Sequence, residues 1–284
     1  MLNQGRLAAQ GCRRFSTAWS IPYAFYDNTL LDIVAQTGTS FENDVFFKPD
    51  GTRMFVLGIS AVRVYGFTLS TPWDISTAVY GGSPADSTSF LSETTSPTSL
   101  VFKSDGTKLF IIESATSAIF SYDLSVPWDV STAVFGGSPN GEVQLLEDTS
   151  ITNIFFKPGG TRMYAVGNAN AAIYGYDLSV PWDVSTAVYG GSPSDVFHIA
   201  QDLSIMDISI RPDGKKMLVV GIGNNTVYSY DLAVAWDIST ASYQGESLSV
   251  AAQTTFPRGI YVRDNGTKMY IVDVLNGKLY QYTL

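Results

Sequence analysis

The sequence predicts an all-β protein, a five-bladed β-propeller built from four-stranded blades of about 54 residues. The first observation is a long repeat, because YDLSVPWDVSTAVFGGSP at Tyr122–Pro139 returns with one change at Tyr176–Pro193. Altered copies begin at Phe67 and Tyr230. The second observation is a hairpin pattern that occurs five times. A chain that repeats at this period is interpreted as an array of similar structural units.

The chain begins with residues 1–11, which lie outside the repeat. They are expected to be either a frayed end or an attachment arm that becomes ordered on a partner. Phe15–Ala18 matches the V/I-S-T-A end of the long repeat, with Arg13 in the place of its tryptophan. The chain ends at Leu279–Leu284, where a third strand is expected. An N-terminal strand should therefore join the C-terminal blade and close one propeller domain over residues 12–284.

Each unit contains a predicted β-hairpin. An apolar run meets a turn rich in Pro, Asp, Asn and Gly, and a second apolar run follows, as in VFFKPDGTRMFVLG at Val45–Gly58. Pro early and Gly late in such a segment suit a tight turn. One glycine in each turn is therefore expected to have positive φ: Gly51, Gly106, Gly160, Gly214 and Gly266.

A third strand of alternating aromatic and small polar residues follows each hairpin, and an outer strand is expected from each Ser-Thr-Ala. Between them lie four tryptophans with steps of 55, 54 and 54 residues: Trp73, Trp128, Trp182 and Trp236. They are interpreted as wedges between blades, since a large aromatic ring buries roughly 150–250 Å². A stacking platform for sugars is the alternative. The Asp after each tryptophan should cap a tight turn.

One basic residue per unit ends the first strand of the hairpin. These residues form a column through the repeat: Lys48, Lys103, Lys157, Arg211 and Arg263. In a protein with a net charge of −9 they are expected to form local ion pairs, with Asp123, Asp177 and Asp231 of the third strands as candidate partners. An anion site on the ring axis is the alternative.

Composition limits the possible partners. The net charge of −9 disfavours nucleic acid, because phosphate binding needs a basic face. No apolar run approaches the roughly 20 residues of a membrane span, so no membrane insertion is expected. The N-terminus also lacks the apolar core of a signal peptide. Cys12 is the only cysteine, so no disulfide can form within the chain.

Catalytic motifs are sparse. His198 is the only histidine, no G-x-S-x-G surrounds a serine, and one His with one Cys cannot build a zinc site from these residue types. No glycine-rich phosphate loop is present. Paired carboxylates such as Glu147 with Asp202, or Glu93 with Glu147, remain as a route to glycoside hydrolysis at a suitable separation. We expect no enzyme, no metal and no cofactor.

The two faces of the ring are expected to differ. One carries the hairpin turns and the tryptophan corners, which are nearly uniform, whereas the other carries connections that vary from unit to unit. Binding residues tend to lie on variable loops over a rigid scaffold. The candidate ligand-binding residues are Glu93, Glu147, Asp148, His198, Gln201 and Asp202, with Tyr243 and Phe256 nearby. Alternatively, these loops only close turns and vary freely.

The alternation of Y-x-Y-D-L-S-x-P-W-D-[IV]-S-T-A with F-F-K-P-D-G-T-[KR]-M resembles a propeller repeat common in phage virion proteins. It is more distantly similar to YVTN-type propellers. The resemblance covers nearly all of Phe15–Leu284 and is specific for the fold. Arg13 and Thr283 depart from the pattern at the ring closure, which puts the tightness of that seam in doubt.

The resemblance implies a non-enzymatic virion structural or accessory protein, an appendage of tail or capsid that displays a propeller for adhesion or host recognition. Its implied partners are other virion proteins, bound through the N-terminal arm, and a host-surface glycan. Its implied location is the virion. One alternative is a lectin-like propeller outside a virion, extracellular or on a cell surface. Another is a propeller hydrolase or lactonase. A shared fold does not decide among them.

Overall fold

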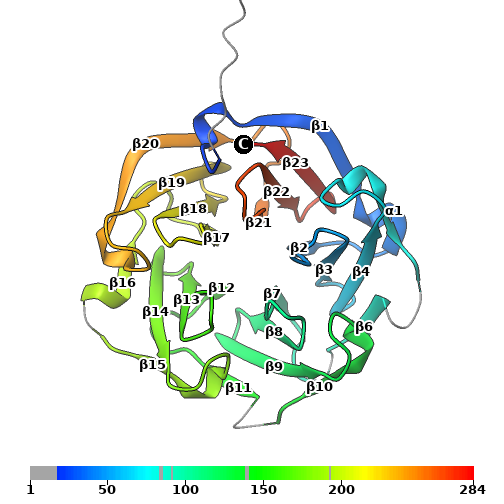
Figure 1. Ribbon diagram of the computed structural model, residues 1–284, viewed down its shortest axis with the longest axis horizontal. Coiled ribbons are helices and arrows are strands. Elements are labelled where there is room, and N and C mark those ends of the chain that lie inside the picture. The colour runs from blue at the N-terminus through cyan, green and yellow to red at the C-terminus, as the bar shows by residue number, and fades with distance from the viewer. Residues whose placement is uncertain (1–17, 83–85, 91, 138–140, 192) are drawn as a thin grey trace, which may run out of the picture.

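The computed structural model describes residues 18–82, 86–90, 92–137, 141–191 and 193–284. Five antiparallel sheets surround a central axis as the blades of a propeller (Figure 1). The predicted five-bladed, four-stranded β-propeller is confirmed. Cys12, Arg13 and the predicted arm at residues 1–11 lie outside the described residues.

In each blade the first three strands run outward from the axis in chain order, and blades 1 to 5 are numbered by their inner strands along the chain. The inner strands are β2 (Glu42–Phe47), β7 (Pro97–Phe102), β12 (Ile151–Phe156), β17 (Ile205–Ile210) and β21 (Pro257–Val262). The second strands are β3 (Arg53–Gly58), β8 (Lys108–Glu113), β13 (Arg162–Gly167), β18 (Lys216–Gly221) and β22 (Lys268–Asp273). The third strands are β4 (Arg63–Leu69), β9 (Ala118–Leu124), β14 (Ala172–Leu178), β19 (Thr226–Leu232) and β23 (Lys278–Thr283).

The outer strands are less regular. In blades 1 to 3 each is split into two short pieces that pair with the same third strand: β5 (Ala78–Tyr80) and β6 (Ser87–Ser89), β10 (Ala133–Phe135) and β11 (Glu142–Gln144), and β15 (Ala187–Tyr189) and β16 (Val196–His198). A GGSP sequence separates the pieces, and proline cannot donate to a strand ladder. Blade 4 has no proline there, and its outer strand is the continuous β20 (Ala241–Ser249). Blade 5 uses β1 (Phe25–Asp32).

The outer strands begin at the alanine of Ser-Thr-Ala and not at the serine, which corrects the sequence prediction. Asp74 Oδ1 accepts hydrogen bonds from the N–H and the hydroxyl of Ser76, at 3.0 and 2.6 Å, and so bends Ser-Thr into a 3₁₀ turn. Such turns are η2 (Ile75–Thr77), η4 (Val130–Thr132), η5 (Val184–Thr186) and η7 (Ile238–Thr240), and η1 (Ile21–Tyr23) is the equivalent turn without the aspartate cap. Further helical segments are α1 (Ile33–Thr37) and η6 (Pro193–Asp195).

The ring closes where β1 pairs antiparallel with β23, as predicted; the two strands lie side by side in Figure 1. The position of the closing tryptophan was wrong. Trp19 takes the place assigned to Arg13, because its N–H donates to Gly266 O at 3.0 Å, just as the Trp73 N–H donates to Gly51 O at 3.1 Å. The matched segment Phe15–Ala18 was therefore out of register by six residues.

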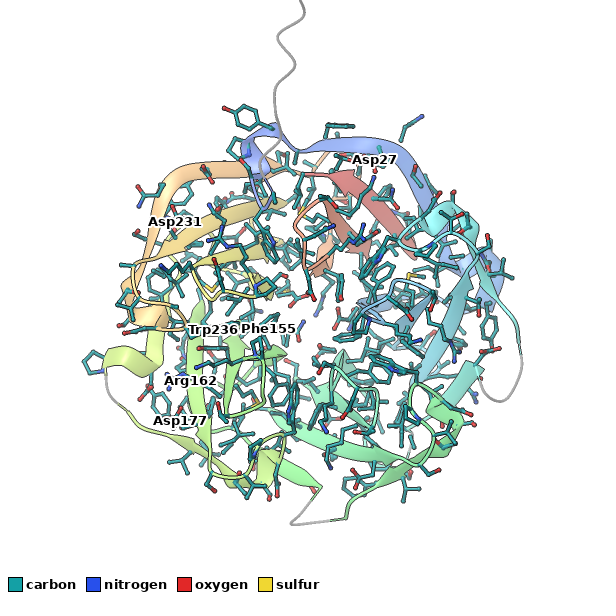
Figure 2. All side chains as sticks on the ribbon, viewed as in Figure 1. Asp27, Phe155, Arg162, Asp177, Asp231 and Trp236 are labelled. Atoms are coloured by element: carbon teal, nitrogen blue, oxygen red, sulfur yellow. The ribbon has the colours of Figure 1, made fainter. Side chains whose placement is uncertain are left out.

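The seam also replaces the aspartate that Thr283 lacks. Lys268 lies opposite Thr283 on the neighbouring strand and forms an ion pair with Asp27 of β1. Figure 2 labels Asp27 on this closing blade. Gln281 also donates to Asp27, at 2.9 Å. The carboxylate that blades 2, 3 and 4 place on their third strand is thus supplied by the N-terminal strand, so the seam keeps its ion pair.

The tryptophans lie between neighbouring blades. Trp73 stacks on Tyr261 of blade 5 with ring centroids 6.2 Å apart, and its carbonyl accepts from Tyr270 Oη at 2.5 Å. Trp128 stacks on Phe55 of blade 1. Each indole also covers a turn glycine: a Cβ on Gly51 would lie 2.3 Å from Trp73. The five turn glycines have φ between 66° and 76°, a region that favours glycine.

Each blade is buried on both faces. On β8, Leu109 and Ile111 pack in a core cluster with blade 1, whereas Phe110 and Ile112 pack in another cluster with blade 3. Successive side chains of a strand point to opposite faces, so an uninterrupted apolar strand fills two blade contacts at once. This explains why the hairpin strands are continuous apolar runs.

Three of the five residues in the basic column form local ion pairs, but not with the predicted partners. Lys48 pairs with Asp50, Lys103 with Asp105 and Arg211 with Asp213, each at 2.8 Å within one turn. Asp123, Asp177 and Asp231 pair instead with Lys108, Arg162 and Lys216. The prediction was wrong because the third strand is hydrogen-bonded to the second strand, not the first. Figure 2 shows Arg162 and Asp177 from such neighbouring strands.

Candidate functional site

The variable connections between blades are fastened to the third strands by tyrosines. Tyr122 Oη donates to Glu93 at 3.3 Å, and Tyr176 Oη donates to Glu147. The same bond occurs in the next two blades, from Tyr230 to Gln201 at 2.5 Å and from Tyr282 to Gln253 at 3.1 Å. Three of the six predicted ligand-binding residues, Glu93, Glu147 and Gln201, thus accept bonds from the scaffold.

Asp148 and Asp202 are buried, with 3% and 2% of their surfaces exposed. Asp148 accepts backbone N–H bonds from Ser150, Ala169 and Asn170 at 2.8, 3.2 and 2.9 Å. Asp202 accepts from the N–H groups of Ser204 and Asn224 at 2.8 and 3.0 Å. Each carboxylate therefore joins the connection entering its blade to the turn between the second and third strands.

The carboxylate at this joint changes place from blade to blade. In blades 3 and 4 it stands on the connection and packs over a glycine, since a Cβ on Gly167 would lie 2.4 Å from Asp148 Oδ2. In blade 2 the connection carries Thr94, and Glu113 stands at the glycine position and accepts from Thr94 Oγ1 at 2.8 Å. Blade 5 likewise combines Thr254 with a buried Asp273. Each of these four blades thus places one carboxylate at the joint.

The six predicted residues are spread around the ring and do not converge on one site. They belong to the connections that enter blades 2, 3 and 4, except His198, which is exposed at the end of β16. Tyr243 packs edge-on against Tyr228 on the same blade face, with ring centroids 6.0 Å apart. Phe256 lies under the guanidinium of Arg258, 5.7 Å from its ring centroid.

One of the six does line an open cleft. The cleft lies beside the outer half of blade 2 and has a volume of about 480 Å³. It is polar at its rim, with two aromatic rings in its wall; the residues that define it are Glu93, Glu113, Phe120, Phe135, Glu142 and Gln144. Sequence reasoning missed Glu113, Glu142 and Gln144. A glutamate at a position where blades 1, 3 and 4 have glycine was the signal that could have found them.

Beside this cleft, blade 2 lacks a hydrogen bond that blades 3 and 4 form at the equivalent place. In blade 3 Asn170 donates to Tyr174 Oη at 3.1 Å, and in blade 4 Asn224 donates to Tyr228 Oη at 3.1 Å. Blade 2 has Thr116 in place of the asparagine and Phe120 in place of the tyrosine. Phenylalanine has no hydroxyl to accept this bond.

The polar side chains of the cleft differ in how far the protein already satisfies their hydrogen bonds. Burial opposes ionisation of Glu113, but hydrogen bonds from Thr116 and Thr94 outweigh it and lower the pKa of this carboxyl. Gln144 donates to Thr116 O at 2.8 Å, which leaves its amide oxygen as an acceptor. Glu142 is half-buried, and its carboxylate makes no hydrogen bond or ion pair with the described part of the chain. Glu142 and Gln144 are thus available to a ligand.

A second cavity, of about 290 Å³, lies on the ring axis and opens on the face of the hairpin turns. Its walls are mainly apolar and include Phe46, Phe155 and Tyr261, with prolines of the turns at the mouth. Figure 2 shows Phe155 and Trp236 near the central opening. Its inner end is polar, where Asp44, Asn153 and Asp207 meet.

The described ranges, 18–284 with four short gaps, contain no group of three His, Cys, Asp or Glu side chains that could hold a metal ion. Among the same residues, no helix is long and apolar enough to cross a membrane.

No protein-family model matches the sequence, and no curated protein matches it. Solved structures do. A protein from Lactobacillus plantarum is 12% identical at a TM-score of 0.50, over 82% of this chain and 64% of that chain. A candidate 6-phosphogluconolactonase from Bacteroides fragilis is 13% identical at 0.49, over 74% and 55%. This chain therefore spans less than two thirds of either. Likeness at such identities shows the fold alone.

Proposed function

We propose that this chain is a non-enzymatic recognition propeller carried on a phage virion, and that its blade 2 cleft binds a glycan of the host surface. The observation that carries the proposal is the contrast between blades. The carboxylates and amides of blades 3 and 4 are engaged by tyrosines and turn N–H groups. Blade 2 keeps Glu142 and the Gln144 oxygen unengaged beside an open cleft.

The chemistry of the cleft suits a polyhydroxylated ligand. Carboxylate and amide oxygens accept hydrogen bonds from hydroxyl groups. The ring of Phe135, half-buried in the wall, offers an apolar face to the carbon skeleton of a sugar. Glu93, Glu113 and Glu142 give the cleft a negative charge, which favours neutral or amino sugars over uronic and sialic acids.

The other face of the ring is suited to attachment. The corners before the tryptophans carry half-exposed valines at equivalent positions: Val126, Val180 and Val234. Exposed valines at matching corners of three neighbouring blades fit packing against a protein scaffold, because exposed apolar side chains on one face favour protein contacts. The resemblance of the repeat to those of phage virion proteins favours a virion as that scaffold.

The proposal is tested by glycan-array binding with three proteins: wild type, Glu142→Lys and His198→Ala. Both substitutions replace side chains of outer-strand pieces, Glu142 at the first residue of β11 in blade 2 and His198 at the last residue of β16 in blade 3. Wild type and His198→Ala should bind the same neutral or amino glycans, whereas Glu142→Lys should bind at least tenfold more weakly. Equal binding by Glu142→Lys, or hydrolysis of a glycan that depends on His198, would contradict the proposal.

A further inference from the structure

A ring of polar side chains closes the inner end of the axial cavity. Its members stand at equivalent positions of the five inner strands: Asp44, Ser99, Asn153, Asp207 and Gly259. Each inner strand has a register shift beside this position, as between Glu42 and Asp44. The four side chains are 1–5% exposed. At the fifth position a Cβ on Gly259 would lie 2.8 Å from Asp44 Oδ1, so only glycine fits.

The ring satisfies N–H groups at the free edges of the inner strands. Asp44 accepts from Val45 N at 2.7 Å and, across the blade contact, from Leu100 N at 3.1 Å. Asn153 accepts from Ile154 N, and Asp207 accepts from Ile208 N and, across the next contact, Ile260 N. Each of the five inner strands thus donates one N–H to one of these three side chains. Asp44 links blades 1 and 2, and Asp207 links blades 4 and 5.

The hydrogen bonds of Ser99 require an additional proton. Its Oγ lies 2.6 Å from Asp44 Oδ2 and 2.6 Å from Asn153 Oδ1. The Asn153 oxygen must be the acceptor, because Ile154 N–H also points to it, at 2.5 Å. A serine hydroxyl has one proton and can donate to only one of these two oxygens. Both short contacts are hydrogen bonds if Asp44 Oδ2 carries a proton and donates it to Ser99.

Among the residues that the structure describes, no Lys or Arg forms an ion pair with either aspartate. The charged group nearest along the strand is Arg258, whose guanidinium lies over Phe256. Arg263 lies over the Trp73 ring, and Asp264 stands at the opposite end of the cavity. The groups that face Asp44 and Asp207 from the five inner strands are therefore each other, Ser99 and Asn153. Complete burial raises the pKa of Asp44 to about 7, and burial with the charge of Asp44 raises that of Asp207.

We propose that the axial ring is a proton-dependent lock, in which one dissociable proton on Asp44 completes the hydrogen-bond chain from blade 1 through Ser99 to Asn153 of blade 3. Loss of the proton leaves Ser99 between two acceptors and places two carboxylates against each other in a site without a cation. The link among blades 1, 2 and 3 then weakens.

The sign of the pH dependence follows. A carboxyl whose folded pKa is raised stabilises the fold fully below its unfolded value of 3.8, and this stabilisation is lost as pH rises through about 7. Asp50 has the opposite effect. Burial opposes its ionisation, but Lys48 and Thr52 lower its pKa to about 2, so its contribution to the stability of the fold is lost as the pH is lowered from 3.8 toward 2. Thermal stability should therefore be highest near pH 4–5 and decline toward pH 8.

The test uses the full chain as wild type, Asp44→Asn, Asp207→Asn and, as a matched control, Asp50→Asn. Infrared spectra at pH 6 should show a protonated carboxylic acid band in wild type and Asp50→Asn that is absent from Asp44→Asn. The Tm of wild type and Asp50→Asn should fall from pH 5 to pH 8, whereas that of Asp44→Asn should fall less, by the part that the buried carboxyl of Asp207 still contributes. In Asp207→Asn the fall should move to lower pH, because one charge is removed.

Asparagine at this position is compatible with the fold, since Asn153 occupies it in blade 3. If Asp44→Asn nevertheless fails to fold, titration of the infrared band in wild type still tests the proton. A wild-type spectrum at pH 6 without the band overturns the proposal. So does a band that persists in Asp44→Asn and disappears in Asp207→Asn, because the proton then belongs to Asp207.

Discussion

The joint carboxylate stands on the entering connection in blade 3 (Asp148) but at the end of the second strand in blade 2 (Glu113). We therefore predict a strong energetic coupling between these two positions, which a double-mutant cycle in blade 2 can measure. The first variant, Glu113→Gly, removes the acceptor for Thr94 Oγ1, Thr95 N and Thr116 Oγ1, at 2.8, 3.3 and 2.7 Å. Bonds to a charged acceptor contribute about 1.5–3 kcal/mol each. Because water can reach part of this turn, we expect a loss of about 3 kcal/mol in the free energy of unfolding.

The second variant, Thr94→Asp, adds a buried carboxylate to a site that already has one. Thr94 is 2% exposed, and an uncompensated buried charge costs about 3 kcal/mol or more. The double variant recreates the arrangement of blade 3, where Asp148 packs over Gly167. It should lose no more than about 3 kcal/mol, not the roughly 6 of additivity, which gives a coupling of about 3 kcal/mol.

Equilibrium urea unfolding, followed by tryptophan fluorescence, measures all four proteins of this cycle. In thermal unfolding each single variant should lower Tm by roughly 6–12 °C, at about 2–4 °C per kcal/mol. Additive losses in the double variant would refute the reasoning, because the carboxylate at the joint would then not be interchangeable between the two positions.

The remaining predictions concern the wedges and the cleft. Trp128→Ala should cost about 3–5 kcal/mol, because the buried indole fills the contact with blade 1, whereas Val134→Ala, 66% exposed on the same blade, should change stability by less than about 0.5 kcal/mol. An unchanged Tm in Trp128→Ala, together with lost glycan binding, would favour the sugar-platform interpretation. Glu142→Lys should retain the wild-type Tm within about 2 °C while losing glycan affinity, since its side chain makes no contact that the fold needs. A large loss of Tm would show that Glu142 has a structural role.

The fold could be predicted because its signals are repeated in nearly unchanged form. Every blade has the same packing, which requires a turn glycine, a tryptophan that covers it and two apolar hairpin strands. The seam was misaligned because its copy of the repeat is altered. Ser20 replaces the capping aspartate, and Pro22 and Tyr23 replace Ser-Thr, whereas a chance Ser-Thr-Ala stands six residues earlier.

The candidate site was harder to predict because sequence does not reveal which polar groups the scaffold engages. Asp148 and Asp202 are of a residue type that is common in binding sites. Their carboxylate oxygens, however, accept hydrogen bonds from N–H groups of turns that are distant in sequence. Conversely, Glu142 follows a GGSP segment that repeats closely, so it did not stand out. Comparison of the five blades position by position shows that Glu113 replaces the glycine of blades 1, 3 and 4 and that Phe120 replaces the tyrosine of the other four blades, and both line the cleft.

The most direct test of the proposed function is quantitative mass spectrometry of phage particles purified by density gradient from the culture that produces this chain. The proposal predicts that the chain bands with the particles at a fixed ratio to the major capsid protein and stays with them through repeated gradients. A chain recovered only in the free protein fractions, at every stage of particle production, would contradict it.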